Sequence, residues 1–125
     1  MSLVNDLPAF EDGGYQAGAQ KVNLREFPVA LQGDNGSCQT VATWQPDRTY
    51  KSVVAGIGMS DDSGTGTSAE FSISVDGRRK FQRTIGVGES AQTATADLKG
   101  AFRVTLTIDN CESGIAVWLD PVITK

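Results

Sequence analysis

The side chains of this chain that could perform chemistry are mainly carboxylates, because the sequence contains no histidine. Without histidine, Ser-His-Asp and Cys-His nucleophile systems and histidine-ligated metal sites are excluded. Glycoside hydrolysis needs two carboxylates at a cleft, and no pair among the 15 acidic residues stands in a context that singles it out. A phosphate-binding G-x-x-x-x-G-K-[ST] loop and a G-x-S-x-G elbow are also missing from the sequence. We therefore predict a protein that is not an enzyme and that has no cofactor.

One acidic loop could bind a cation. Asp61-Asp62-Ser63 is followed by glycines and then by Glu70, and these side chains could supply oxygen ligands to calcium. The spacing fails the EF-hand pattern, because Ser72 occupies the position of the bidentate glutamate. A solvated acidic loop between two strands is the first interpretation, and calcium binding is the alternative.

Aromatic side chains beside loops are the candidates for ligand binding. β-Sandwich proteins that recognise sugars stack exposed aromatic rings on the sugar and place polar groups beside them. Trp44 and Trp118 each stand just before a loop, and we expect them to be the stacking residues, with Asp61, Asp62 and Asp120 as polar partners. A structural role in the core is the alternative for each ring, because the chain has few aromatic residues.

The two cysteines of the chain could indicate the cellular compartment in which the protein is found. Cys38 and Cys111 lie 73 residues apart, and neither belongs to a C-x-x-C motif, which excludes zinc and thioredoxin-like sites. A disulfide and a pair of reduced, buried thiols both stay open. We predict the disulfide, which would place the protein in an oxidising compartment outside the cytoplasm.

Charge restricts the partners. A net charge of −4 argues against nucleic acid and anionic membranes as general partners. The only basic cluster is Arg78, Arg79, Lys80 and Arg83, for which a solvated hairpin tip and edge strand is the first interpretation and contact with a polyanion the alternative. No apolar run approaches the roughly 18 residues of a membrane span, so we expect no direct membrane insertion.

The elements that must position these residues are short strands. Phe71, Ile73 and Val75 alternate with polar residues, and the following Asp76-Gly77 is typical of a tight hairpin turn. In residues 101–109 a similar alternation predicts Phe102, Val104, Leu106 and Ile108 on the inner face. Gly56 and Gly58 are expected to mark either a bulge or a close approach by another element.

The strand pattern covers the whole chain. Strands are predicted at residues 21–24, 27–31, 38–45, 51–59, 69–75, 79–87, 92–98, 101–109, 114–119 and 122–124. No window of ten or more residues has a convincing helical period. We predict an all-β fold, an antiparallel β-sandwich of jelly-roll type that forms one domain over residues 1–125. Residues 1–3 are expected to be a cloning scar on a piece of a longer protein.

Several segments together resemble the NPCBM family (novel putative carbohydrate-binding module, or NEW2). The matching segments are Val4–Leu7, the Tyr50-Lys51 step with the loop Gly58–Asp62, the strand and turn Glu70–Gly77, and Asp97–Leu106. In the family's late Asp-His-x-x-Trp element, this chain reads Gly114–Trp118 and keeps only the tryptophan. The resemblance implies a galactose-binding-like sandwich that serves as a non-catalytic module on secreted or cell-surface proteins. The implied partner is a carbohydrate or cell-surface polysaccharide.

The chain is also similar to extracytoplasmic domains of actinobacterial serine/threonine kinases and related surface proteins. The likeness lies in the region from Tyr50-Lys51 to Asp61-Asp62 and in a cysteine near the position of Cys38. It implies an alternative function, in which the sandwich is a sensor or protein-interaction ectodomain with a protein ligand.

Overall fold

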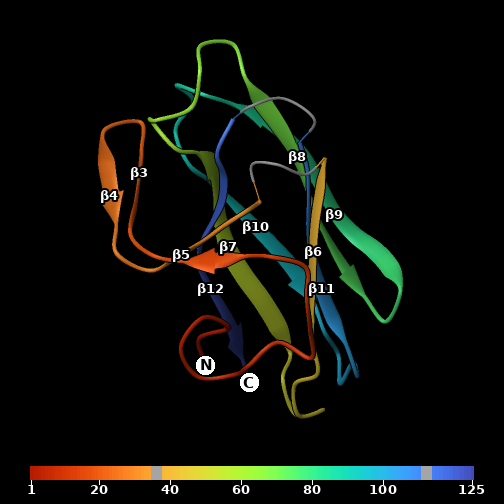
Figure 1. Cartoon of the computed structure of the whole chain (residues 1–125). Coiled ribbons are helices and arrows are strands. Elements are labelled where there is room, and N and C mark those ends of the chain that lie inside the picture. The colour runs from red at the N-terminus through yellow and green to blue at the C-terminus, as the bar shows by residue number, and fades with distance from the viewer. Residues whose placement is uncertain (35–37, 111–113) are drawn as a thin grey trace.

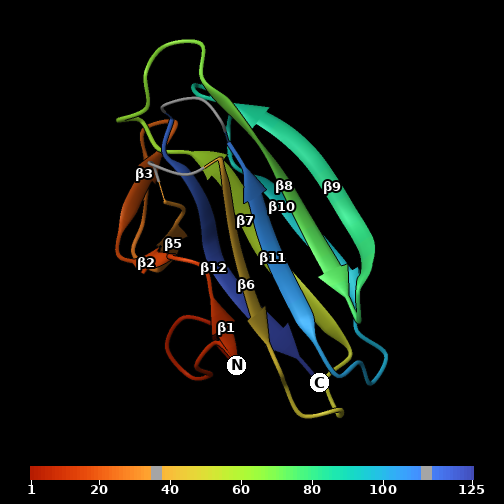
Figure 2. The ribbon, with the colours of Figure 1, turned by 45° about the vertical axis from the view of Figure 1, so that its right-hand side comes forward.

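Two antiparallel sheets packed face to face make up most of the computed structural model, which describes residues 1–34, 38–110 and 114–125 (Figures 1 and 2). Within these ranges there is no helix, and hence none that is long and apolar enough to cross a membrane. In chain order the strands are β1 (Glu11–Asp12), β2 (Gln16–Ala17), β3 (Gln20–Val22), β4 (Arg25–Phe27), β5 (Ala30–Gln32), β6 (Gln39–Trp44), β7 (Ser52–Met59), β8 (Ser68–Val75), β9 (Arg78–Gly86), β10 (Gln92–Asp97), β11 (Val104–Asp109) and β12 (Ala116–Thr124). The predicted β-sandwich is confirmed.

Each layer of the sandwich contains five strands. The order is β1-β6-β11-β8-β9 in one sheet and β10-β7-β12-β5-β2 in the other, and β3 pairs with β4 in a separate hairpin. The central strand β11 faces the core with Val104, Leu106 and Ile108, as its alternation predicts. Phe102 is a correction, because the strand begins only at Val104 and the ring is 44% exposed.

The turn between β8 and β9 has the predicted tight geometry. Asp76 and Gly77 have φ angles of 50° and 84°, the left-handed conformation that a two-residue hairpin turn requires. The Asp76 carboxylate accepts hydrogen bonds from the backbone N–H groups of Phe102 and Arg103, with its Oδ1 at 3.0 and 2.8 Å from the two nitrogens. This contact ties the β8–β9 turn to the segment before β11.

A second, smaller core lies on the outer face of the second sheet. Val22, Ala30, Val117 and Leu119 form it, and the β3–β4 hairpin projects from the sandwich beside it (Figure 1). A Cβ atom added at Gly58 would lie 2.7 Å from Val22 Cγ1, and one at Gly56 would lie 2.9 Å from Leu119 Cβ. The predicted close approach at these two glycines is therefore confirmed.

The amino-terminal segment is part of the fold. Leu3 is buried, Ser2 forms a bridge with Val122, and Met1 and Ile123 exchange two backbone hydrogen bonds of 2.9 Å. Both termini consequently lie at the same end of the sandwich (Figure 1). That residues 1–3 are a cloning scar stays a prediction, but these residues pack as an integral part of the domain.

The predicted disulfide joins Cys38 to Cys111, and Cys111 lies outside the described residues. The described neighbours bring the two segments together: Asp109 pairs with Gln39, and the Asn110 N–H donates to the Cys38 carbonyl at 2.7 Å. The pairing of Cys38 with Cys111 stays a prediction.

Candidate ligand-binding site

The expectation that Trp44 and Trp118 are exposed is wrong. Their side chains are 2% and 0% exposed, and Trp118 packs edge-on against Phe71 in the core with ring centroids 5.3 Å apart. The Trp118 indole N–H donates to Tyr15 Oη, and the Trp44 indole N–H donates to the Leu3 and Leu7 carbonyls. The apolar faces of these rings stabilise the core, so neither ring is available for stacking on a ligand in this structure.

Asp61 has a structural partner. Its two carboxylate oxygens accept hydrogen bonds from the backbone N–H groups of Asn23 and Leu24, at 2.7 and 2.8 Å. These two residues form the β3–β4 turn with φ angles of 47° and 69°. Asp61 therefore fixes the hairpin to the loop after β7. Asp62 is exposed and lines a shallow hollow with Lys21 and Glu26.

Asp120 lies apart from the other two predicted carboxylates. It sits at a bulge of β12, where the pairing with β7 shifts between Leu119 and Val122, and its φ is 44°. Its N–H donates to the Val29 carbonyl and its side chain is exposed. No hollow found among the described residues contains two of Asp61, Asp62 and Asp120.

The described residues of the acidic loop do not gather into a cluster of metal-binding side chains. The described residues contain no group of three acidic, cysteine or histidine side chains that could hold a metal ion. Each Asp61 oxygen accepts one backbone N–H hydrogen bond, which gives this carboxylate a structural role in the β3–β4 turn.

A further hollow lies elsewhere, at the end of the sandwich that carries both termini. We call it the terminal cleft, and it has a volume of about 560 Å³. It opens between the edge strands β9 and β10, which belong to different sheets. Away from the cleft, the two edge strands are in contact, because Arg83 Nη1 of β9 donates to Gln92 Oε1 of β10 at 2.6 Å. The cleft is therefore the region in which β9 and β10 diverge.

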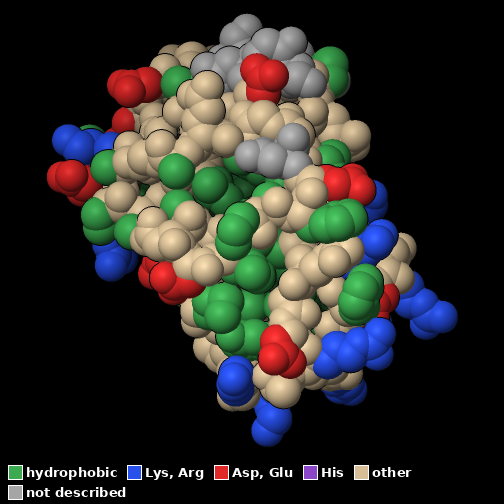
Figure 3. Space-filling model, turned by 60° about the horizontal axis from the view of Figure 1, so that its bottom comes forward, with side chains coloured by type: hydrophobic (Ala, Val, Ile, Leu, Met, Phe, Trp, Pro, Cys, Tyr) green, Lys and Arg blue, Asp and Glu red, His purple; other side chains and the backbone are tan. Residues whose placement is uncertain are grey.

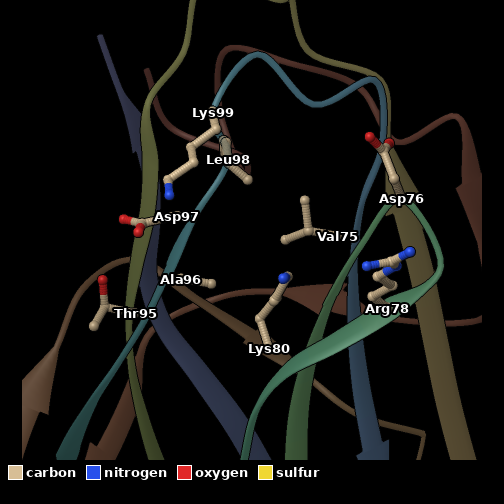
Figure 4. Close-up of a pocket in the computed structure, with 9 residues that line it drawn as sticks. All are labelled: Val75, Asp76, Arg78, Lys80, Thr95, Ala96, Asp97, Leu98 and Lys99. Carbon is tan, nitrogen blue, oxygen red and sulfur yellow. The ribbon is translucent and has the colours of Figure 1, made fainter.

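A β-bulge in β9 aims basic side chains into the terminal cleft. Ile73 pairs with Phe81 and Val75 pairs with Arg78, so the register shift between them leaves one extra residue on β9. Without the extra residue, Arg79 would pair with Val75. With it, Arg78 takes that position, and Arg78 and Lys80 both line the cleft. Figure 4 shows the Lys80 ammonium group extending into the space between the two strands. The intervening Arg79 does not line the cleft, and its Nη1 donates to Gln82 Oε1 at 3.0 Å.

The opposite wall of the terminal cleft is β10 and the turn that follows it. Ala96 and Leu98 are buried and turn inward, where with Val75 they form an apolar floor. Thr95 and Asp97 alternate with them and point to the other side of β10 (Figure 4). Lys99, at a turn position with φ of 47°, stands on the rim.

A second hollow of about 490 Å³ adjoins the terminal cleft and shares Asp97 and Lys99 with it. Arg48, Tyr50 and Lys51 line its remaining wall. Figure 3 shows this end of the molecule, with Lys and Arg side chains projecting around its lower margin and hydrophobic side chains exposed between them.

Exposed aromatic rings near this end are stacked with arginines. Phe10 and Phe102 are 53% and 44% exposed, and the Arg103 guanidinium carbon lies 5.2 and 5.7 Å from their ring centroids. Arg48 lies 5.2 Å from the Phe102 centroid. These are cation–π contacts, and they hold guanidinium groups over the rings.

Sequence reasoning found part of the terminal cleft. It identified the basic cluster that includes Arg78 and Lys80, with polyanion contact as the alternative interpretation, but it missed Lys99 and the role of β10. The signal was weak, because Asp97-Leu98-Lys99-Gly100 is a turn after a short strand. The cleft lies between β9 and β10, which belong to different sheets. Hydrophobic periodicity predicts single strands, but it does not show which strands of different sheets lie side by side.

Comparison with known proteins gives a family model and a set of solved structures. The model of the NPCBM/NEW2 domain matches residues 33–124. The structure of CBM51 from Clostridium perfringens GH95 in complex with methyl-galactose is similar over 99% of both chains, with a TM-score of 0.79 and 14% identity. Among curated proteins, none matches this sequence.

Two further structures have the same architecture. The M60 catalytic domain with the CBM51-1 and CBM51-2 domains from Clostridium perfringens ZmpB matches 94% of this chain over 14% of its own length, with a TM-score of 0.75 and 14% identity. A carbohydrate-binding module CBM36 in complex with calcium and xylotriose matches 99% of this chain and 98% of its own, with a TM-score of 0.50 and 11% identity. At these identities the likeness shows the fold, which is that of carbohydrate-binding modules.

Proposed function

The chain belongs to the NPCBM/NEW2 domain family, and from that premise we propose that it is a non-catalytic module that binds carbohydrate at the terminal cleft. The observation that carries the proposal is the cleft itself, on a sandwich with the fold of carbohydrate-binding modules. Its volume of about 560 Å³ lies in the range of ordinary small-ligand sites. An apolar floor with polar donors at its margin suits a sugar, which presents C–H faces and hydroxyl groups together.

The carboxylates of the cleft are poorly arranged for hydrolysis. Asp76 is committed to the backbone N–H groups of Phe102 and Arg103, and Asp97 points to the far side of β10. A glycosidase requires one carboxyl group to donate a proton and a second to act as base or nucleophile on the same bond. This arrangement supports the proposed binding role without catalysis.

A glycan array tests the function. We expect the domain to bind a specific glycan, and we expect Lys80→Trp to abolish binding because a large ring there would fill the cleft. Arg79→Trp is the matched control, since its neighbouring side chain lies outside the cleft. Binding should be the same in calcium and in EDTA, because Asp61 and Asp62 do not line the terminal cleft. A folded domain that is silent on the array would overturn the proposal.

The proposed location is extracellular or at the cell surface, as the extracytoplasmic part of a longer protein. The proximity of Asn110 to Cys38 supports a Cys38–Cys111 disulfide, and such bonds persist in oxidising compartments. The net charge of −4 argues against a nucleic-acid partner, and the lack of an apolar run of roughly 18 residues in this sequence argues against direct membrane insertion.

One observation favours a second candidate function. Both tryptophans are buried, which is what a sensor or protein-interaction ectodomain of a membrane-anchored serine/threonine kinase or another surface protein would tolerate. A protein ligand in place of a glycan would then occupy this end of the domain. Retention of a specific protein partner by a domain that is silent on the glycan array would favour this function over the first.

A further inference from the structure

We propose that the terminal cleft selects glycans that carry a carboxylate or sulfate group, and that Arg78, Lys80 and Lys99 bind this group. The inference rests on the proposed function and adds the class of sugar to it. The same three residues would orient the sugar ring over the floor of Val75, Ala96 and Leu98.

The distribution of charge is the first observation. Five of the eleven basic residues of the chain line the terminal cleft and the adjoining hollow, against two of its 15 acidic residues. The whole chain has a net charge of −4, so this excess of positive charge is a local property of one end. Low-dielectric walls around a charged cleft concentrate its potential and attract ligands of the opposite sign.

The two carboxylates do not neutralise the cleft. Asp76 accepts hydrogen bonds from two backbone N–H groups, and Asp97 points away from Lys80 across β10. Within the described ranges, no carboxylate lies within 4.0 Å of the charged nitrogens of Arg78, Lys80 or Lys99. The β9 side of the cleft therefore presents two cationic side chains, Arg78 and Lys80, to an anionic ligand, and Lys99 adds positive charge at the rim, where Figure 4 shows its ammonium group on the Asp97 side of β10.

The β9 bulge gives this arrangement its specificity. In a regular strand Arg78 and Lys80 would share the outer face and Arg79 alone would face the cleft, whereas the bulge places both Arg78 and Lys80 at the cleft. A planar guanidinium suits two oxygens of one acidic group, and an ammonium adds a point charge beside it. The apolar floor adds contact area for a sugar ring, which distinguishes a glycan from a bare inorganic anion.

The adjoining hollow extends the site. Lys99 belongs to both hollows, and Arg48 and Lys51 stand on the far wall of the second. A chain of acidic sugars could therefore place one acidic group at Lys80 and another near Arg48 or Lys51. We expect oligosaccharides with repeated acidic groups to bind more tightly than single acidic sugars.

Calorimetric titration with matched glycans tests the inference. The probes are an oligogalacturonide, a sulfated galactan oligosaccharide and a neutral galactan oligosaccharide, together with inorganic sulfate and single-stranded DNA. We expect at least about tenfold preference for an acidic glycan over the neutral one, which is what one charge-assisted hydrogen bond is worth. The better bound of the two acidic oligosaccharides identifies whether carboxylate or sulfate is the preferred group.

Charge-matched variants locate the effect. Lys80→Gln and Arg79→Gln each remove one positive charge from neighbouring, exposed positions of β9, so neither should unfold the domain. Affinity for the acidic glycan should fall about tenfold in Lys80→Gln and hardly change in Arg79→Gln. Affinity of the native domain should also fall with added salt. An equal loss in both variants would reduce the effect to general electrostatics and overturn the inference.

The remaining outcomes separate this inference from the proposed function. Tighter binding of the neutral galactan would overturn the inference and leave the carbohydrate-binding function in place. No binding of any glycan, on these probes and on the array, would overturn both. Binding of inorganic sulfate or single-stranded DNA as tight as that of the acidic glycans would show an unselective anion site and overturn the inference.

Discussion

Asp61 illustrates how an acidic residue that resembles a ligand can be structural. Its position in an Asp-Asp-Ser loop suggests calcium, but both of its oxygens accept backbone N–H groups from Asn23 and Leu24. Those N–H groups belong to a tight turn with positive φ angles. The pairing of β3 with β4 ends at Val22 and Arg25, so it does not supply hydrogen-bond acceptors for the turn. The carboxylate supplies that partner from a loop 37 or 38 residues away.

Removal of this carboxylate should weaken the domain. We expect Asp61→Ala to lower the free energy of unfolding by about 1.5 kcal/mol, the lower end for hydrogen bonds to a charged group, because the site is partly exposed. The neighbouring Asp62→Ala is the control and should change it by less than about 0.5 kcal/mol. Urea denaturation measures both. Equal losses in the two variants would contradict the assigned role of Asp61.

At the scale of elements, two local irregularities shape the molecule. The bulge in β9 decides which basic residues meet the terminal cleft, and the glycines of β7 let another element pack on its outer face. Val22 of β3 occupies the space that a side chain at Gly58 would need. The small second core therefore depends on the absence of a single methyl group.

Gly58→Ala tests this contact. The added Cβ would lie 2.7 Å from Val22 Cγ1, so the β3–β4 hairpin must move, and we expect a loss of roughly 1–3 kcal/mol in the free energy of unfolding. Gly64→Ala is the matched control, because its Cβ would meet only Thr67 Cγ2 at 3.7 Å.

The partner residue provides a second check. The cost of Gly58→Ala should shrink when Val22 is already alanine, since the clashing methyl groups are then gone. A double-mutant cycle in urea denaturation measures this coupling. If the two substitutions are simply additive, the contact between β3 and β7 does not explain the glycine.

At the scale of the whole molecule, the two sheets are joined at the β9–β10 edge by the Arg83–Gln92 hydrogen bond and at one end by the amino-terminal segment. The amino-terminal segment closes the end that carries the terminal cleft, through Leu3 in the core and the backbone pairing of Met1 with Ile123. At the other end, β6 and β11 bring Cys38 beside Asn110, the residue before Cys111.

The predicted disulfide belongs to this scale. A bridge that closes a loop of 73 residues should contribute roughly 4 kcal/mol in the chain-entropy model. We expect the unreduced, unfolded protein to show no reactive thiol, and a reductant to lower its Tm markedly. Two reactive thiols in that titration would instead indicate reduced cysteines and would remove the support for an oxidising compartment.

Local pattern determined much of this protein. Alternating apolar residues in β8 and β11, the Asp76-Gly77 turn and the two glycines of β7 predict strands, a hairpin and a close approach, and all of them are present. These features are visible in the sequence because each depends on neighbours within a few residues, through side-chain periodicity or backbone conformation. The family resemblance, which rests on the order of such local features, is likewise confirmed.

Only the tertiary structure decided which side chains are buried and which line the terminal cleft. The sequence places Trp44 and Trp118 beside loops, but burial is set by the opposing sheet, and both rings lie in the core. It shows Arg78, Arg79 and Lys80 as one basic run, whereas a bulge in the pairing of β8 with β9 separates them. The terminal cleft lies between strands of two different sheets, so its walls are contacts between distant residues that no local pattern encodes.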